Sequence, residues 1–294
     1  MLARIDAPQL TLGGSFTVRG TGVFTGVGCR ITLEPTGADH GLVFLAPDRT
    51  GRLHRIPVSA SALLTNPNHT TLVSLEDPAV QIHMVEHVLS ALHGLWIDNA
   101  LLTVEGGECP LNDGSARDYL EGLATVGIAT LDAPRTILRV DREMEFGEGD
   151  ATLLLRPPTQ EGLSIRYTLD YSATYPQIGR ATVVFEPLDP ARYTAEIGPA
   201  RTFIPVDEAE RLVAAGVIRS TEDPACLVVY PDWTNHPLRV PHEYAAHKVL
   251  DLIGDLRLCG YPVWAEIIGH RSGHGLNHQA ARWLGEQASR PNAT

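Results

Sequence analysis

The period of the apolar residues changes along this chain, and that change constrains the fold more than any other feature of the sequence. Residues 8–60 alternate between apolar and polar side chains, are rich in β-branched residues and contain glycine turns, as strands do. From Met84 to Leu95 the period becomes helical, because Val85, Leu89 and Leu92 recur on one face. The first part of the chain is therefore expected to form strands followed by a helix.

The same order of elements recurs in the second half. In the first half we expect strands at 15–19, 30–34, 42–45 and 99–105 and a second helix at 118–127. In the second half we expect strands at 136–140, 151–156, 163–169, 181–186 and 262–268, and helices at 206–215, at 243–259 and from Asn277. Strands grouped before helices favour an α+β fold over alternating parallel units. We place a linker at Ala133-Pro134, which predicts domains at 1–133 and 134–294.

Composition narrows the class of protein. The chain has 294 residues, of which 44% are apolar and 20% charged, so it should be globular. A net charge of −12 argues against a nucleic-acid partner, because phosphate binding needs clustered cations. The four cysteines are far apart, and we find neither a signal peptide nor a membrane-spanning apolar run. We therefore expect a cytoplasmic protein with reduced thiols. We also expect a monomer.

The chain contains one lysine, Lys248, against 22 arginines. Lysine offers a compact point charge that arginine does not reproduce, so its single use suggests a tight polar site. On a helix, His247, Asp251 and Asp255 share one face, and an imidazole one turn from a carboxylate is a natural pair of metal ligands. The alternative is a solvated face with an ion pair. We favour the site because the flanking residues are apolar, and a buried carboxylate requires a cation.

Two further motifs contain histidines. His83, Glu86 and His87 match the H-x-x-E-H zinc motif of inverted zincin peptidases, although a surface helix with two histidines also fits.

Three histidines recur later at a spacing of four, namely His270, His274 and His278. Gly273 and Gly275 disfavour a helix there, so we expect a loop that holds a functional His274, followed by a helix capped near Asn277. His270 and His278 are then spectators.

Taken together, the motifs resemble one enzyme family. They are, in chain order, the Gly-rich segment 20–26, Met84–Leu92, Ile97–Asn99, Pro110–Ser115, Ala200–Phe203, His247–Leu256 and Ser272–Asn277. This series is similar to the zinc-dependent UDP-3-O-acyl-N-acetylglucosamine deacetylases of lipid A synthesis. The matches keep their order and span most of the chain, which makes the resemblance more specific than any single motif.

The resemblance implies two domains, each a sheet layered against helices, with the active site between them. It implies Zn²⁺ on His87, His247 and Asp251, with a position left for water; Fe²⁺ is the alternative occupant. It implies Glu86 as general base, His274 as general acid with Asp255 as its partner, Thr202 and Lys248 near the oxyanion, Phe203 in the sugar pocket and Arg271 on the diphosphate. The implied substrate is UDP-3-O-acyl-N-acetylglucosamine, which loses its N-acetyl group.

Alternatives remain at this point. His83 and Met84 replace small polar residues that usually precede the Val-Glu-His of the family. The chain can therefore also be a paralogue that deacetylates another N-acetyl sugar, or one that only binds a nucleotide sugar. A peptidase built on the H-x-x-E-H motif explains that motif alone and leaves Lys248 and His274 without a role.

Overall fold

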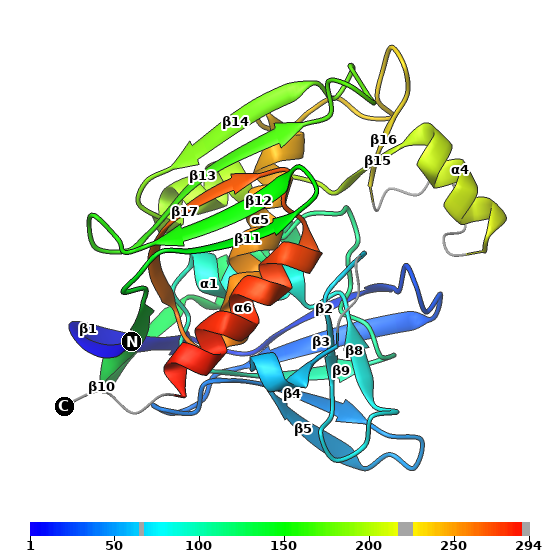
Figure 1. Cartoon of the computed structure of the whole chain (residues 1–294). Coiled ribbons are helices and arrows are strands. Elements are labelled where there is room, and N and C mark those ends of the chain that lie inside the picture. Colours follow the sequence, from blue (N-terminus) through cyan, green and yellow to red (C-terminus); the bar gives the residue numbers. More distant parts are fainter. Residues whose placement is uncertain (65–67, 217–225, 290–294) are drawn as a thin grey trace.

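Two sheets enclose a group of helices in the computed structural model (Figure 1). The model describes residues 1–64, 68–216 and 226–289. Three helices, α1 (Glu86–Gly94), α5 (Glu243–Leu256) and α6 (His274–Ala288), lie in the middle of the view, with one sheet above them and the other below. Strands and helices are both plentiful and largely segregated along the chain, which confirms the predicted α+β class.

A five-stranded sheet is built from the first half of the chain. Its order is β2 (Phe16–Thr21), β3 (Gly28–Glu34), β9 (Ala100–Glu105), β4 (Leu42–Pro47) and β5 (Leu53–Pro57). Only β4 and β9 run parallel. The alternation seen in the sequence places Ile31, Leu33 and Val104 on the buried face, which is why this segment folds as a sheet. A small sheet of β6 (Leu63–Leu64), β7 (Thr71–Val73) and β8 (Gln81–His83) leads into α1.

A seven-stranded sheet occupies the other side of the helices. It contains β1 (Leu2–Leu12), β10 (Ile128–Arg139), β11 (Met144–Glu148), β12 (Ala151–Arg156), β13 (Leu163–Asp170), β14 (Arg180–Phe185) and β17 (Val263–His270). Strand β17 is central, because it pairs antiparallel with β12 and parallel with β13 and β10. The sequence analysis missed β11, whose exposed residues carry little apolar pattern.

The expected linker at Ala133-Pro134 is wrong, because both residues lie inside β10. This strand pairs with β1, and the register shifts where Pro8 faces Pro134. Proline has no backbone N–H to donate. The two prolines therefore interrupt the backbone hydrogen bonds between β1 and β10, which continue on both sides of them. The first strand of the chain thus joins the sheet formed by the second half. A division into domains at this point remains a prediction.

The helix predictions are largely confirmed. Helices α1, α2 (Arg117–Val126), α4 (Val206–Ala214) and α5 lie where the sequence analysis expected them. The last helix is an exception, since it begins at His274 with Gly273 as its N-cap, three residues before the expected Asn277. Its glycines lie at the first turn and the cap, where they cost little helix stability. Among residues 1–64, 68–216 and 226–289, no helix is long and apolar enough to cross a membrane.

The remaining described elements are short. They are the parallel pair β15 (Phe203–Pro205) and β16 (Leu227–Val229), the single turn α3 (Pro190–Arg192), and the turns 60–62, 193–197 and 257–259.

Helices α1 and α5 pack unusually closely, and a glycine permits it. A Cβ built on Gly254 would lie 2.1 Å from the backbone oxygen of Glu86. Buried polar bonds cross the same contact: the Ser90 hydroxyl donates to the Leu250 carbonyl at 2.7 Å, and His93 Nδ1 lies 2.8 Å from the Ile253 carbonyl. The glycine at position 254 thus allows α5 to lie directly against the start of α1.

We expect Gly254→Ala to destabilise the protein by about 1–3 kcal/mol, because the added methyl must push two backbones apart. Gly275→Ala is the matched control, since it is also helical and its Cβ would meet nothing closer than 3.7 Å. That change should be neutral or stabilise the fold by up to about 1 kcal/mol. Urea denaturation followed by circular dichroism measures both, and equal stabilities of the two variants would contradict the packing argument.

Candidate active site

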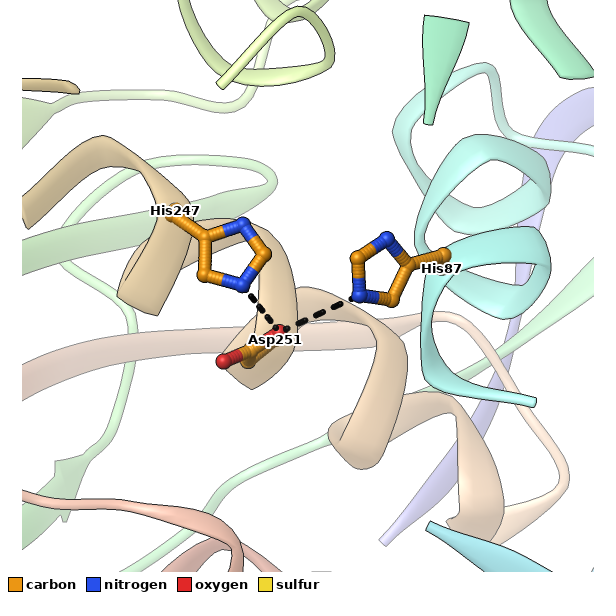
Figure 2. A group of neighbouring side chains, drawn as sticks. All are labelled: His87, His247 and Asp251. Atoms are coloured by element: carbon orange, nitrogen blue, oxygen red, sulfur yellow. Dashed lines mark ion pairs between the residues drawn. The ribbon is translucent and has the colours of Figure 1, made fainter. Parts of the chain in front are cut away.

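Two helices bring the candidate metal ligands together. Glu86 and His87 are the first residues of α1, and His247 and Asp251 lie one turn apart on α5 (Figure 2). The Oδ1 atom of Asp251 is 3.3 Å from His247 Nε2 and 3.9 Å from His87 Nε2. The three side chains are buried, with at most 2% of their surface exposed. The residues expected from the sequence to bind zinc therefore form one group, His87–His247–Asp251, which we call the three-ligand group.

The chemistry of this group fits a divalent cation. His247 Nδ1 lies 3.1 Å from the Ala200 carbonyl, an acceptor, so Nδ1 carries the hydrogen and the lone pair of Nε2 faces the group. Asp251 Oδ1 has no hydrogen-bond partner among the described residues, although it is buried. A buried carboxylate oxygen without a donor is costly unless a cation satisfies it. Two imidazole nitrogens and one carboxylate oxygen are the donor set of catalytic zinc sites, which keep a further position open.

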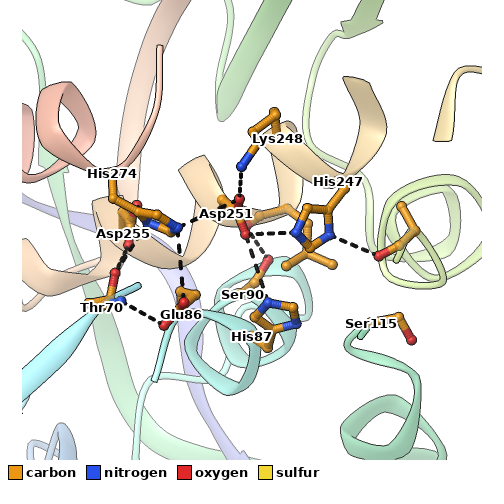
Figure 3. A network of polar contacts seen from close by, with 12 residues as sticks. Thr70, Glu86, His87, Ser90, Ser115, His247, Lys248, Asp251, Asp255 and His274 are labelled. Carbon is orange, nitrogen blue, oxygen red and sulfur yellow. Dashed lines mark hydrogen bonds and ion pairs between the residues drawn. The ribbon is translucent and has the colours of Figure 1, made fainter. Parts of the chain in front are cut away.

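Lys248 lies beside this group and neutralises part of it. Its Nζ donates to Asp251 Oδ2 at 2.9 Å (Figure 3). It also lies 5.8 Å from the centre of the Phe203 ring. Burial disfavours the charged ammonium, but the adjacent Asp251 carboxylate outweighs it and raises the pKa of Lys248 above its ordinary value. The side chain is 23% exposed, so the ammonium stays accessible from outside.

Glu86 is buried next to the three-ligand group. Its exposed fraction is 1%, and its Oε2 accepts the backbone N–H of Thr70 at 3.1 Å. Burial raises the pKa of Glu86 to about 8; His274 opposes this shift, and Asp255 and Asp251 add to it. A cation on the adjacent ligands would lower this pKa again, which would leave a carboxylate able to accept a proton near neutral pH.

His274 lies on the other side of Glu86. Its Nδ1 donates to Asp255 Oδ2 at 2.8 Å, and its Nε2 lies 4.0 Å from Glu86 Oε1 and 3.8 Å from Asp251 Oδ2. Burial disfavours the imidazolium, but the surrounding carboxylates, Asp255 first, raise the pKa of His274 to about 9. The expectation that His274 sits in a loop is wrong, because it is the first residue of α6. Asn277, expected as the cap, instead donates to Asp255 Oδ2 at 3.0 Å.

The other predicted site residues lie outside this buried network. The backbone N–H of Thr202 donates to the Gly114 carbonyl at 2.7 Å, directly after the buried ion pair of Arg201 and Glu243. Phe203 packs against Tyr244 with 4.9 Å between ring centres.

Arg271 follows β17 and is 41% exposed, with a loose ion pair of 3.8 Å to Asp150. It is therefore available at the surface and makes no contact with the three-ligand group in the described structure.

His83 and His278 belong to the other two histidine motifs, and both lie outside the three-ligand group. His83 Nδ1 lies 3.0 Å from His69 Nε2 and 3.1 Å from the Thr71 hydroxyl, so it is not part of the three-ligand group. His278, expected to be a spectator, is fully buried, and its Nε2 lies 2.9 Å from the Thr70 hydroxyl. The sequence analysis also missed Thr70, because a threonine ahead of a short strand carries no signal of its own.

Known proteins are similar to this chain over most of its length. A family model described as LpxC, UDP-3-O-acyl N-acetylglycosamine deacetylase, matches residues 9–286. A UDP-3-O-acyl-N-acetylglucosamine deacetylase of Phenylobacterium zucineum is 34% identical over 97% of this chain and 94% of its own length. Enzymes of the same name from Thermosynechococcus vestitus and Cellvibrio japonicus are 34% and 33% identical, over 96% and 95% of this chain and 96% and 90% of their own.

We expect Asp251→Ala to abolish stoichiometric zinc binding, because it removes one of the three donors. His83→Ala is the matched control and should retain zinc, since His83 contacts His69 and Thr71 instead. Elemental analysis of dialysed protein measures both. Zinc retained by Asp251→Ala and lost from His83→Ala would reverse the assignment in favour of the H-x-x-E-H motif.

Proposed function

Because the chain belongs to the UDP-3-O-acyl-N-acetylglycosamine deacetylase family, we propose that Glu86 and His274 catalyse the hydrolysis that this family performs. The protein is a zinc-dependent hydrolase of lipid A synthesis. It removes the N-acetyl group of UDP-3-O-acyl-N-acetylglucosamine, which releases acetate and leaves a free 2-amine. One observation supports the residue roles above all: a base and an acid, 4.0 Å apart, adjoin a buried group that fits a metal.

His87, His247 and Asp251 would hold the zinc ion. When bound, zinc supplies Lewis acidity, which polarises a carbonyl and lowers the pKa of a water toward about 7.

Glu86 is proposed as the general base. Its carboxylate takes a proton from the attacking water as the new C–O bond forms to the acetamide carbon. The carbonyl oxygen then gains negative charge. Lys248 and Thr202 are proposed to stabilise it, because Lys248 holds an accessible ammonium next to Asp251.

His274 is proposed as the general acid. Its Nδ1–H is occupied by Asp255, so Nε2 is the atom that faces Glu86 and the three-ligand group. A proton on Nε2 passes to the sugar nitrogen as the C–N bond breaks, and the amine leaves uncharged. Asp255 orients the imidazole and favours its protonated form.

Phe203 and Arg271, which lie outside the buried network, are proposed to contact the substrate. Phe203 offers an aromatic face beside Lys248, which suits a sugar ring. Arg271 is exposed, and its only described ion pair is loose, so its guanidinium is free to bind a diphosphate. We place the protein in the cytoplasm, where the buried thiols of Cys29, Cys109 and Cys259 would stay reduced.

We expect the zinc-loaded protein to remove one acetyl group from UDP-3-O-(3-hydroxyacyl)-N-acetylglucosamine, as measured by mass spectrometry. Glu86→Ala should lower kcat by about 10²–10⁴-fold, because it removes the base. Glu210→Ala, on the exposed side of α4, is the control and should keep full activity.

No acetyl loss across several acyl lengths, from protein that holds zinc, would overturn the substrate assignment. It would favour a paralogue that acts on another N-acetyl sugar or only binds a nucleotide sugar.

We expect the dependence of kcat/KM on pH to be bell-shaped. The rate rises as Glu86 loses its proton and falls as His274 loses its own, and the raised pKa of His274 places the falling limb above the ordinary histidine range. His274→Ala should lower the rate and remove the falling limb. A variant that keeps the wild-type profile would contradict the acid role.

A further inference from the structure

We propose that Thr70 is a positioning residue that holds the general base and the general acid pair in a fixed relation. This inference rests on the proposed function and assigns a role to a residue outside the motifs of the family resemblance. Thr70 immediately precedes β7 and is fully buried. It contacts residues of α1, α5 and α6, the three helices that carry the site (Figure 3).

The backbone of Thr70 fixes the start of α1. Its carbonyl accepts the N–H of Val85 at 3.3 Å, and Val85 is the N-cap of that helix. Its N–H donates to Glu86 Oε2 at 3.1 Å. One carboxylate oxygen of the base is thereby held, which leaves Oε1 as the oxygen that faces His274 Nε2.

The side chain of Thr70 fixes the acid pair. Its hydroxyl lies 2.5 Å from Asp255 Oδ1, while Asp255 Oδ2 accepts from His274 and Asn277. Nearby imidazoles overcome the effect of burial and hold the pKa of Asp255 far below its usual range, so its carboxylate can only accept. The Thr70 hydroxyl therefore donates its single hydrogen to Asp255.

This assignment determines the role of His278. The Thr70 hydroxyl donates its only hydrogen to Asp255, so its oxygen, at 2.9 Å from His278 Nε2, must act as acceptor there. His278 Nε2 therefore carries a hydrogen. A series of two hydrogen bonds runs from His278 through Thr70 to Asp255, with each donor pointing toward Asp255. The series aligns Asp255 so that its other oxygen holds His274 with Nε2 turned toward the reaction.

Thr71 shows that the contacts of Thr70 are specific. Both threonines are fully buried, but the Thr71 hydroxyl lies 3.1 Å from His83 Nδ1, away from the base and the acid. Thr70 and Thr71 therefore differ in the residues that their hydroxyls contact and not in their burial.

The test compares kcat and KM of Thr70→Val, Thr70→Ser and Thr71→Val with those of the wild-type enzyme, on UDP-3-O-(3-hydroxyacyl)-N-acetylglucosamine. Valine keeps the shape and backbone of threonine but removes the hydroxyl. We expect Thr70→Val to lower kcat by about 10–100-fold with KM nearly unchanged, because a small misplacement of an acid or a base strongly slows a reaction. Thr70→Ser should restore kcat to within a few-fold, and Thr71→Val should retain it.

Zinc content and thermal unfolding are measured on the same samples. We expect zinc content to be equal in all of them, because no metal ligand is changed. Wild-type kcat in folded Thr70→Val, or an equal loss in Thr71→Val, would overturn the proposal. An inactive wild-type enzyme would instead overturn the proposed function, so the two failures are distinguishable.

If Thr70→Val does not fold, a pair of variants at His278 tests the same series from its other end. His278→Gln retains an N–H donor at a similar reach, whereas His278→Leu does not. A loss of kcat confined to His278→Leu would support the series, and equal activity of the two folded variants would overturn it.

Discussion

The close crossing of α1 and α5 is the constraint on which the rest of the site depends. Gly254 has no side chain where α5 meets the backbone of Glu86, and any Cβ there would overlap that backbone. Because the helices approach so closely, His87 on one and Asp251 on the other come within 3.9 Å. The metal-binding capacity of the site is thus a consequence of backbone packing between segments about 160 residues apart in sequence.

Compensation of buried charge organises the side chains around this crossing. Asp251 faces two imidazoles and the Lys248 ammonium, and Asp255 accepts from Thr70, His274 and Asn277. A buried carboxylate without such partners would be strongly disfavoured. The same contacts that offset the cost of burial also orient Glu86 and His274, the proposed base and acid, so stability and the proposed function rely on one network.

Local sequence patterns predicted most elements and the His247/Asp251 pair, whereas the full three-ligand group came from the family resemblance. Helix α5 shows why, since its apolar stripe, its single lysine and its His-x₃-Asp spacing lie within one continuous segment. The failures occurred where distant segments meet. Ala133-Pro134 was expected to be a linker, but it lies inside a strand because β1 pairs with it. His274 was expected in a loop, but it begins a helix, because the glycines lie at the N-terminus of that helix.

The sequence by itself determined the α+β class and the pairs of residues that one helix turn can place together, because these depend on local periodicity and residue type. The ordered series of motifs determined the family, and the proposed chemistry of the site follows from that resemblance. Only the tertiary structure decided which histidines belong to the site. His83 and His278 are equivalent in type, but packing turned the first toward His69 and the second toward Thr70. Thr70 acquires its contacts with Glu86 and Asp255 only when three helices converge on it, and such convergence leaves no mark on the residues nearby in the chain.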